Sequence, residues 1–300
     1  SHNPAEWNGL KPFDAAGRVF DAETGARLIA EMELLAGVDA SPVCTDAEVI
    51  GNPGAVHRDT VVGIVDAAAI RGRRLKVVLD CNHGSGAVLG PELLNTLGCH
   101  VTVLGGTPDG EFAHPPEPLE EHLTGLCRAV VDHGADVGFA QDPDADRLAL
   151  IDETGLYIGE EYTLALVADH LLSKHQGASA AANLSTSRMI DDIAAMHGGT
   201  VLRSAVGEAN VASVMKEHAC VIGGEGNGGV IFPKVCWVRD SLSGMAIILD
   251  LMQQRTERLS DIAGALPRYE IIKQSVNLVD LGGLSALEKE LDSAVKAGHN

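Results

Sequence analysis

The chain has 300 residues, of which 45% are hydrophobic, so it is long enough for about two domains with substantial apolar cores. Its formal net charge of −20 argues against a nucleic-acid or anionic-membrane partner, because phosphate backbones require clustered lysine and arginine. A small phosphorylated ligand stays compatible with this charge, since such a ligand needs only a local cationic pocket or a cation.

Apolar, β-rich runs alternate with amphipathic helical runs from residue 57 onward. The first series predicts helix 57–70, strand 75–80, helix 91–98, strand 100–104, helix 118–134, strand 135–140 and strand 148–152. The second series predicts helix 159–174, strand 181–184, helix 187–199, strand 200–203, helix 208–218, strand 220–223 and helix 241–254. A third series begins at 269–279. The alternation therefore predicts consecutive α/β units with partly parallel sheets.

The segment FAQDPDADRLALID, residues 139–152, places Asp142, Asp144 and Asp146 at alternate positions between two predicted strands. Alternate residues of an extended segment share one side, so three carboxylates gather there without a lysine among them. Such a hard oxygen site suits Mg²⁺, and the cation would also remove the mutual repulsion. The next residue, Arg147, is placed to hold a phosphate or to pin a neighbouring carboxylate.

Three other interpretations of this acidic segment stay open on the residues alone. An EF-hand loop also has aspartate at positions one, three and five, and Glu153 falls at position twelve, but Arg147 occupies the position that requires glycine. The predicted flanking elements are also strands instead of helices. A solvated acidic turn and a helix N-cap cluster are the other two alternatives.

Two glycine-rich segments are candidate ligand loops. In GGEGNGGV, residues 223–230, Glu225 and Asn227 lie two residues apart, which suits adjacent sugar hydroxyls, and the run VIFPKV with Pro233 follows where a dinucleotide fingerprint requires a helix. HGSGAVLG, residues 83–90, is similar to an NADP-type turn and supports a rival hypothesis, an NADP-dependent oxidoreductase. No charged residue ends the following strand to contact a ribose, which favours a structural strand-to-helix turn.

The opening segment SHNPAEWNGLK, residues 1–11, is dense in turn formers. Ser1 and His2 are adjacent, which does not suit a general-base pair, and Lys11 lies where a loop could curl back toward Ser1. On composition alone, a turn-rich surface loop is favoured.

The six cysteines form no C-x-x-C pair, and a chain of this size needs no disulfides for stability. No apolar run reaches membrane-spanning length, and no signal peptide is visible. We therefore expect reduced thiols and a cytoplasmic location. Because the chain opens inside a loop and stops soon after a predicted strand, we also expect it to be a fragment, truncated at both ends.

Taken together, these motifs resemble the α-D-phosphohexomutase family of phosphoglucomutases, phosphomannomutases and phosphoglucosamine mutases. SHNP with NGLK resembles the family's phosphoserine loop, TPDGEFAHPPEP (107–118) the segment before its metal loop, and DPDADR the D-G-D-G-D-R metal loop. VGEAN (206–210) and GEGNGG (224–229) resemble its two sugar-facing loops, and RDSLSGM follows them. The resemblance covers nearly the whole chain, in the family order.

The resemblance implies consecutive three-layer α/β domains with mixed, mostly parallel sheets around a central cleft. It divides the chain into the end of domain I (1–52), domain II with the metal loop (53–155), domain III with the sugar loop (156–266) and an incomplete domain IV (267–300).

The implied activity is phosphoryl exchange with a small-molecule sugar phosphate through a phosphoserine at Ser1 and a bisphosphorylated sugar. Mg²⁺ would be held by a phosphoserine oxygen of Ser1 and by Asp142, Asp144 and Asp146. Lys11 and Arg147 would add positive charge, while His2 and Asn3 would shape the phosphoserine loop. The sugar would be bound by Gly207, Glu208, Glu225, Asn227 and Gly228.

The substrate expected from the resemblance is glucosamine 6-phosphate, converted to glucosamine 1-phosphate, because the sugar loop contains Asn227. Mannose and glucose phosphates are the alternatives within the family, and a non-catalytic fragment is an alternative outside it. Many family members carry histidine where this chain has Gly229. Lys11 or Glu208 is then the candidate proton acceptor. The sequence does not indicate the oligomeric state.

Overall fold

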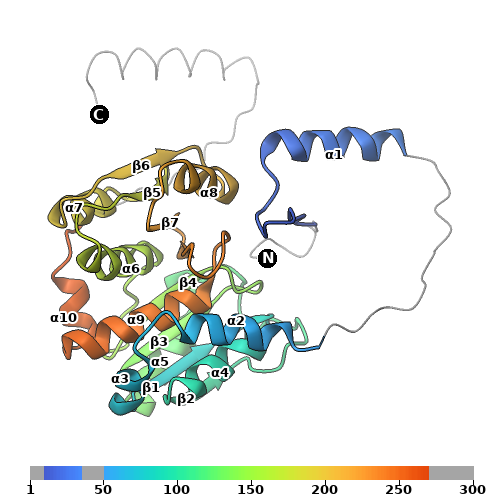
Figure 1. Cartoon of the computed structure of the whole chain (residues 1–300). Coiled ribbons are helices and arrows are strands. Elements are labelled where there is room, and N and C mark those ends of the chain that lie inside the picture. Colours follow the sequence, from blue (N-terminus) through green and yellow to red (C-terminus); the bar gives the residue numbers. More distant parts are fainter. Residues whose placement is uncertain (1–9, 36–50, 270–300) are drawn as a thin grey trace, which may run out of the picture. The chain divides into compact units, whose positions relative to one another are not determined.

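The computed structural model describes residues 10–35 and 51–269, and it contains two four-stranded sheets (Figure 1). The first sheet consists of β1 (Lys76–Asp80), β2 (His100–Leu104), β3 (Val137–Gln141) and β4 (Leu148–Asp152). The strand order is β2-β1-β3-β4, in which β1 pairs in parallel with β2 and β3, and β4 runs antiparallel to β3. The strands β3 and β4 are buried along their whole length, as their continuous apolar runs predict.

The second sheet repeats this topology. It consists of β5 (Ala180–Asn183), β6 (Val201–Ser204), β7 (Ile222–Glu225) and β8 (Gly229–Ile231) in the order β6-β5-β7-β8. Again the first three strands are parallel, and the last strand returns antiparallel to its neighbour. The acidic loop between β3 and β4 and the glycine loop between β7 and β8 therefore occupy equivalent places in the two units.

Ten α-helices and one 3₁₀ helix are described within residues 10–35 and 51–269. They are α1 (Ala22–Leu34), α2 (Pro53–Val62), α3 (Ala67–Arg73), α4 (Gly86–Thr96), α5 (Thr124–His133), α6 (Glu160–Lys174), α7 (Met189–Met196), α8 (Glu208–Glu217), α9 (Ser241–Arg255) and α10 (Leu259–Gly264), with the short 3₁₀ helix η1 (Glu120–His122) as the eleventh helical element. Every residue from Ser241 to Met252 of α9 is buried. Helices α6 and α9 pack against each other and contribute to one continuous apolar core that includes residues of both sheets.

Three predicted helices were wrong in extent. The predicted helix 91–98 begins five residues earlier, since α4 runs from Gly86 to Thr96. The predicted helix 57–70 is two helices, because α2 ends at its C-cap Gly63 and α3 begins after Asp66, whose side chain accepts a hydrogen bond from the Ala69 N–H. The predicted helix 118–134 forms a regular α-helix only from Thr124. Before Thr124 the chain forms the short 3₁₀ helix η1, and the Tyr157 hydroxyl donates a hydrogen bond to the Pro118 carbonyl at 3.1 Å.

The prediction of an α/β fold with mixed, mostly parallel sheets is confirmed. The sequence patterns did not reveal β8, α1 or α10. Compact packing extends to Arg268, and the predicted third series lies, apart from Tyr269, outside the described residues. Among residues 10–35 and 51–269, no helix combines the length and hydropathy that a bilayer span requires.

Candidate active site

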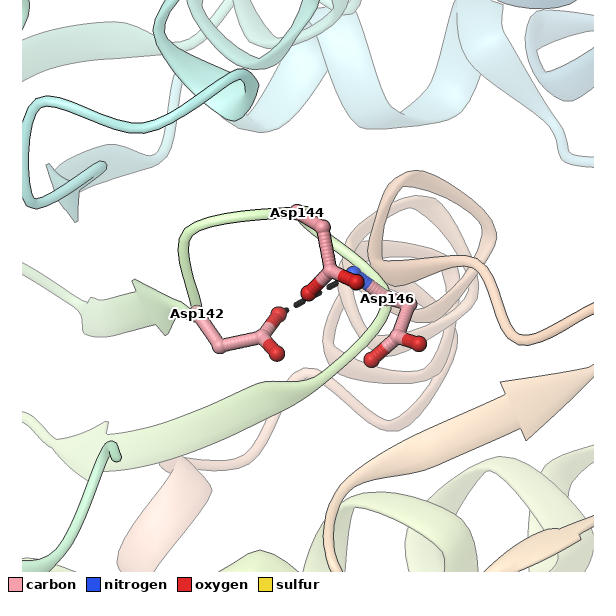
Figure 2. A group of neighbouring side chains, drawn as sticks. All are labelled: Asp142, Asp144 and Asp146. Atoms are coloured by element: carbon pink, nitrogen blue, oxygen red, sulfur yellow. Dashed lines mark hydrogen bonds between the residues drawn. The ribbon is translucent and has the colours of Figure 1, made fainter. Parts of the chain in front are cut away.

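The loop between β3 and β4 brings the three predicted metal ligands together. Each of Asp142, Asp144 and Asp146 offers a carboxylate oxygen within 4.8 Å of the others, and Figure 2 shows the side chains converging from one loop. The Oδ1 atom of Asp142 accepts hydrogen bonds from the backbone N–H groups of Asp146 and Arg147, both at 3.0 Å. Ala145 closes the turn with a φ of 57°, in the left-handed region.

Two oxygens of this loop favour a bound cation. Among the described residues, Asp142 Oδ2 and Asp146 Oδ1 are buried and have no hydrogen-bond partner. Burial raises the pKa of Asp142 well above its usual range, and the charges of Asp146 and Asp144 add to this effect. Unpartnered buried carboxylate oxygens are costly unless a cation neutralises them. The residues present therefore fit a divalent ion, and the strands on both sides rule out an EF-hand.

Two cationic side chains lie against Asp146. The Lys11 Nζ donates to Asp146 Oδ2 at 3.1 Å and lies 3.6 Å from Glu208 Oε2. The Arg239 Nη2 donates to the same Oδ2 at 2.5 Å, while its Nη1 donates to Glu225 Oε2 at 2.7 Å. The oxygen Oδ2 is therefore engaged by the protein, and Oδ1 is the oxygen left for a ligand.

The glycine loop between β7 and β8 contacts the start of β4 directly. The Leu148 N–H donates to the Gly228 carbonyl at 3.1 Å, and a Cβ on Gly228 would lie 2.4 Å from the Leu148 carbonyl oxygen. Gly228 also has a φ of 83°, so both its conformation and its close contact require glycine. Beside it, Asn227 Oδ1 accepts from the Gly229 N–H at 3.3 Å. The two predicted ligand loops thus lie side by side.

The Glu225 carboxylate is fully engaged at the end of β7. Its Oε1 accepts from Asn183 Nδ2 at 2.7 Å and from the Gly207 N–H at 3.2 Å, and its Oε2 accepts from Arg239. Glu208, the first residue of α8, is also buried, and its Oε1 accepts from the Arg239 N–H. Burial raises the pKa of Glu208.

The segment 83–90, in which α4 begins at Gly86, supports the metal loop. The Ser85 N–H and Oγ both donate to the Pro143 carbonyl, at 2.8 and 3.1 Å. A Cβ on Gly84 would lie 2.6 Å from the same carbonyl oxygen. The glycines of this segment therefore permit close packing against the metal loop, which matches the structural turn favoured over an NADP site.

The start of α9 also contacts the metal loop. The Ser241 Oγ donates to the Ala145 carbonyl at 2.6 Å and accepts from Gln141 Nε2 at 2.7 Å. Its predecessor Asp240 is the N-cap, since its side chain accepts from the N–H groups of the second and third helical residues. His57 of α2 lies 3.2 Å from Asp240, measured from Nε2 to Oδ2. Helix α9 thus helps to fix the acidic loop.

The structure brings most of the predicted site residues together: Lys11, Asp142, Asp144, Asp146, Arg147, Gly207, Glu208, Glu225, Asn227 and Gly228. Arg147 is buried, with its Nε 3.9 Å from Asp146 Oδ1. Ser1, His2 and Asn3 lie outside the described residues. Sequence reasoning missed Arg239 and Asn183. Arg239 lies in the noted RDSLSGM segment, but no local pattern indicates which acids it contacts.

Comparison with known protein families shows to which family the chain belongs. Residues 55–155 match the family described as phosphoglucomutase/phosphomannomutase, alpha/beta/alpha domain II, and residues 159–269 match its domain III. The chain belongs to the α-D-phosphohexomutase family. These two ranges separate the α/β unit that carries the metal loop from the one that carries the glycine loop.

Curated members of the phosphohexomutase family match over most of the chain. It is 38% identical over 274 residues to a phosphoglucomutase/phosphomannomutase of Thermococcus kodakarensis, covering 90% of this chain and 59% of that protein. It is 34% identical over 283 residues to a probable phosphoglucosamine mutase of Methanopyrus kandleri, covering 93% of this chain and 62% of that protein. The chain therefore spans about three fifths of the length of these relatives.

The fold also matches a solved family structure. A phosphoglucomutase/phosphomannomutase family protein from Burkholderia thailandensis superposes with a TM-score of 0.65 at 28% identity, covering 72% of this chain and 46% of that one. Over that part of the chain, the fold is thus shared with the solved family member.

Proposed function

We propose that this protein is a Mg²⁺-dependent phosphohexomutase that moves a phosphoryl group between the 1- and 6-positions of a hexose. The observation that carries the proposal is the acidic loop beside the sugar-facing loop, in which the buried Asp142 Oδ2 and Asp146 Oδ1 lack hydrogen-bond partners among the residues that the structure describes. Family membership supports the same reaction class.

The metal would be held by Asp142, Asp144 and Asp146, together with an oxygen of a phosphorylated Ser1. When bound, Mg²⁺ supplies charge neutralisation at the transferring phosphoryl group. Lys11 provides a second positive charge at this place. Burial would lower the pKa of Lys11, but the charges of Asp146 and Glu208 outweigh that effect and raise it, so the ammonium stays protonated.

Glu208 is the residue we assign to accept the proton of the attacking sugar hydroxyl. It lies at the N-terminus of α8 beside Lys11 and Arg239, and Gly229 carries no side chain that could compete for this role. The sugar hydroxyl oxygen attacks the phosphorus, its proton passes to Glu208, and the bond between the phosphorus and the Ser1 oxygen breaks, which leaves that oxygen with a negative charge balanced by the Lys11 ammonium. In the second half-reaction the Ser1 oxygen attacks the other phosphate, and the sugar oxygen that is released takes the proton back from Glu208.

The substrate we propose is glucosamine 6-phosphate, converted to glucosamine 1-phosphate. Asn227 in the sugar loop supports this choice, as do the similar proteins named probable phosphoglucosamine mutases. Comparing kcat/KM for the 6-phosphates of glucosamine, mannose and glucose tests the assignment. A preference for mannose or glucose 6-phosphate would contradict it.

The proposed metal role predicts a loss of turnover in Asp144→Asn. Asp144 is the exposed member of the trio, so the fold should be unaffected, while Mg²⁺-dependent mutase activity should fall about 100-fold or more because one charged contact at the reacting group is lost. Asp132→Asn, an exposed aspartate on α5, is the matched control and should retain activity. Unchanged Mg²⁺-dependent activity in Asp144→Asn would refute the proposal.

A further inference from the structure

Arg239 makes contact with three parts of the candidate site. Its guanidinium donates to Asp146 in the metal loop at 2.5 Å and to Glu225 at the end of β7 at 2.7 Å. Its backbone N–H donates to Glu208 at the start of α8. These three acids come from both α/β units, so one arginine joins the loops of the two units.

The arginine is held in place by its own surroundings. Only 10% of its side chain is exposed. A Cβ on Gly229 would lie 2.2 Å from Arg239 Cδ and 2.9 Å from Cγ, so the arginine stem occupies the space above that glycine. The following residue is also anchored, because the Asp240 N–H donates to the Val230 carbonyl at 2.8 Å. Its guanidinium therefore has little freedom to leave the acids that it contacts.

The contact with Asp146 selects which carboxylate oxygen faces the metal position. Oδ2 accepts from Arg239 and Lys11, while Oδ1 is buried and has no hydrogen-bond partner in the described part of the chain. Asp142 shows the same division, with Oδ1 accepting from backbone N–H groups and Oδ2 without a hydrogen-bond partner among residues 10–35 and 51–269. In each of these two buried aspartates, described residues donate hydrogen bonds to one oxygen and none to the other, and the Arg147 guanidinium lies near Asp146 Oδ1, with its Nε 3.9 Å away.

We propose that Arg239 is a positioning residue that fixes Asp146 for metal binding and links the metal loop to the sugar-facing loop through Glu225. This inference rests on the proposed Mg²⁺ site. Outer partners of metal ligands orient the ligand atoms, and their loss commonly weakens metal binding by about 10- to 100-fold.

A purely electrostatic role for Arg239 makes the opposite prediction. A guanidinium beside the carboxylates repels an incoming cation, so its removal would tighten Mg²⁺ binding if charge were its only contribution. A positioning role predicts weaker binding, because Asp146 would be free to turn. The direction of the change in affinity therefore separates the two roles.

The test is isothermal titration of Mg²⁺ into the protein and its variants without sugar phosphate. Arg239→Met keeps an apolar side chain near Gly229 and removes the guanidinium that donates to Asp146 and Glu225. We expect the Mg²⁺ affinity of this variant to fall about 10- to 100-fold. Arg239→Lys keeps the charge without the two-pronged geometry, and we expect an intermediate loss. Arg255→Met, at the C-terminal end of α9, removes one of the two partners of buried Asp169 on α6, and this variant should bind Mg²⁺ like the wild type.

Circular dichroism identifies any variant that fails to fold, and the lysine variant then carries the test. Wild-type Mg²⁺ affinity or tighter binding in a folded Arg239 variant would overturn the positioning role. If Asp144→Asn loses Mg²⁺ binding in the same experiment, the proposal that the acidic loop binds the metal would still be supported. A wild-type protein that does not bind Mg²⁺ would overturn both the proposed site and this inference.

Discussion

Replacing Asp142 by asparagine should stabilise the metal-free protein. Asp142 is fully buried, and its neighbours' oxygens lie within 4.8 Å, where two like charges repel by about 3 kcal/mol at an effective dielectric constant of about 20. Asp144 is exposed, and Lys11 and Arg239 offset part of the Asp146 charge. We therefore expect the free energy of unfolding of metal-free Asp142→Asn to exceed that of the wild type by about 2 kcal/mol. An asparagine Oδ1 can accept the same two backbone hydrogen bonds, so none is lost.

The gain should depend on pH and on Mg²⁺. Because the pKa of Asp142 is raised in the folded state, this carboxyl destabilises the protein above its unfolded pKa, near 3.9. The advantage of Asp142→Asn should therefore be present at neutral pH and disappear below about pH 4. Saturating Mg²⁺ stabilises only a protein that binds it. The stability advantage of Asp142→Asn over the wild type should therefore shrink or reverse in the presence of the ion.

Thermal unfolding in EDTA and in Mg²⁺ measures both effects. A gain of about 2 kcal/mol corresponds to a rise in Tm of about 4–8 °C for a domain of this size. Asp152→Asn is the matched control, because Asp152 is buried at the other end of β4 and accepts hydrogen bonds from the N–H groups of Thr154 and Leu156. A lower Tm of Asp142→Asn in EDTA at neutral pH would refute the reasoning from like-charge repulsion.

Two further substitutions test the packing around the site. The hydrogen bond to Asp240 raises the pKa of His57, so this pair stabilises the fold fully below pH 6.5 and loses its contribution as the pH rises through the raised pKa. In His57→Gln, the free energy of unfolding measured with urea should therefore depend less on pH above pH 6.5 than in the wild type. An unchanged pH dependence would exclude the His57–Asp240 pair as its cause. Gly229→Ala should cost about 1–3 kcal/mol by crowding Arg239, whereas Gly125→Ala in α5, where a Cβ meets nothing, should stabilise by about 0.5–1 kcal/mol. Equal effects of the two alanines in chemical denaturation would argue against crowding.

The strands and the metal loop could be predicted because their signals are local. The buried strand at 148–152 is a continuous apolar run, and the aspartate spacing at 142–146 indicates an oxygen site without knowledge of the fold. The break in the predicted helix 57–70 had local signals too, in Gly63 and Asp66, but the apolar periodicity continued across them. Periodicity shows which face is apolar and does not show where a helix stops.

The remaining part of the site depends on contacts between distant residues. Arg239 and Asp146 are separated by 93 positions, and Asn183 and Glu225 by 42. Nothing near Arg239 indicates that its partners are acids on three different elements. Strand β8 has only three residues, and its pairing with β7 becomes visible only when the sheet is formed.

The junction of 239–241 has a consequence for how the chain tolerates changes in length. Arg239 reaches Asp146, Asp240 caps α9 beside His57, and Ser241 holds the carbonyl of Ala145. Adding or deleting one residue before α9 would turn the start of that helix by about 100°. All these contacts would fail together, so we expect insertions and deletions to be excluded here, even where single substitutions are accepted.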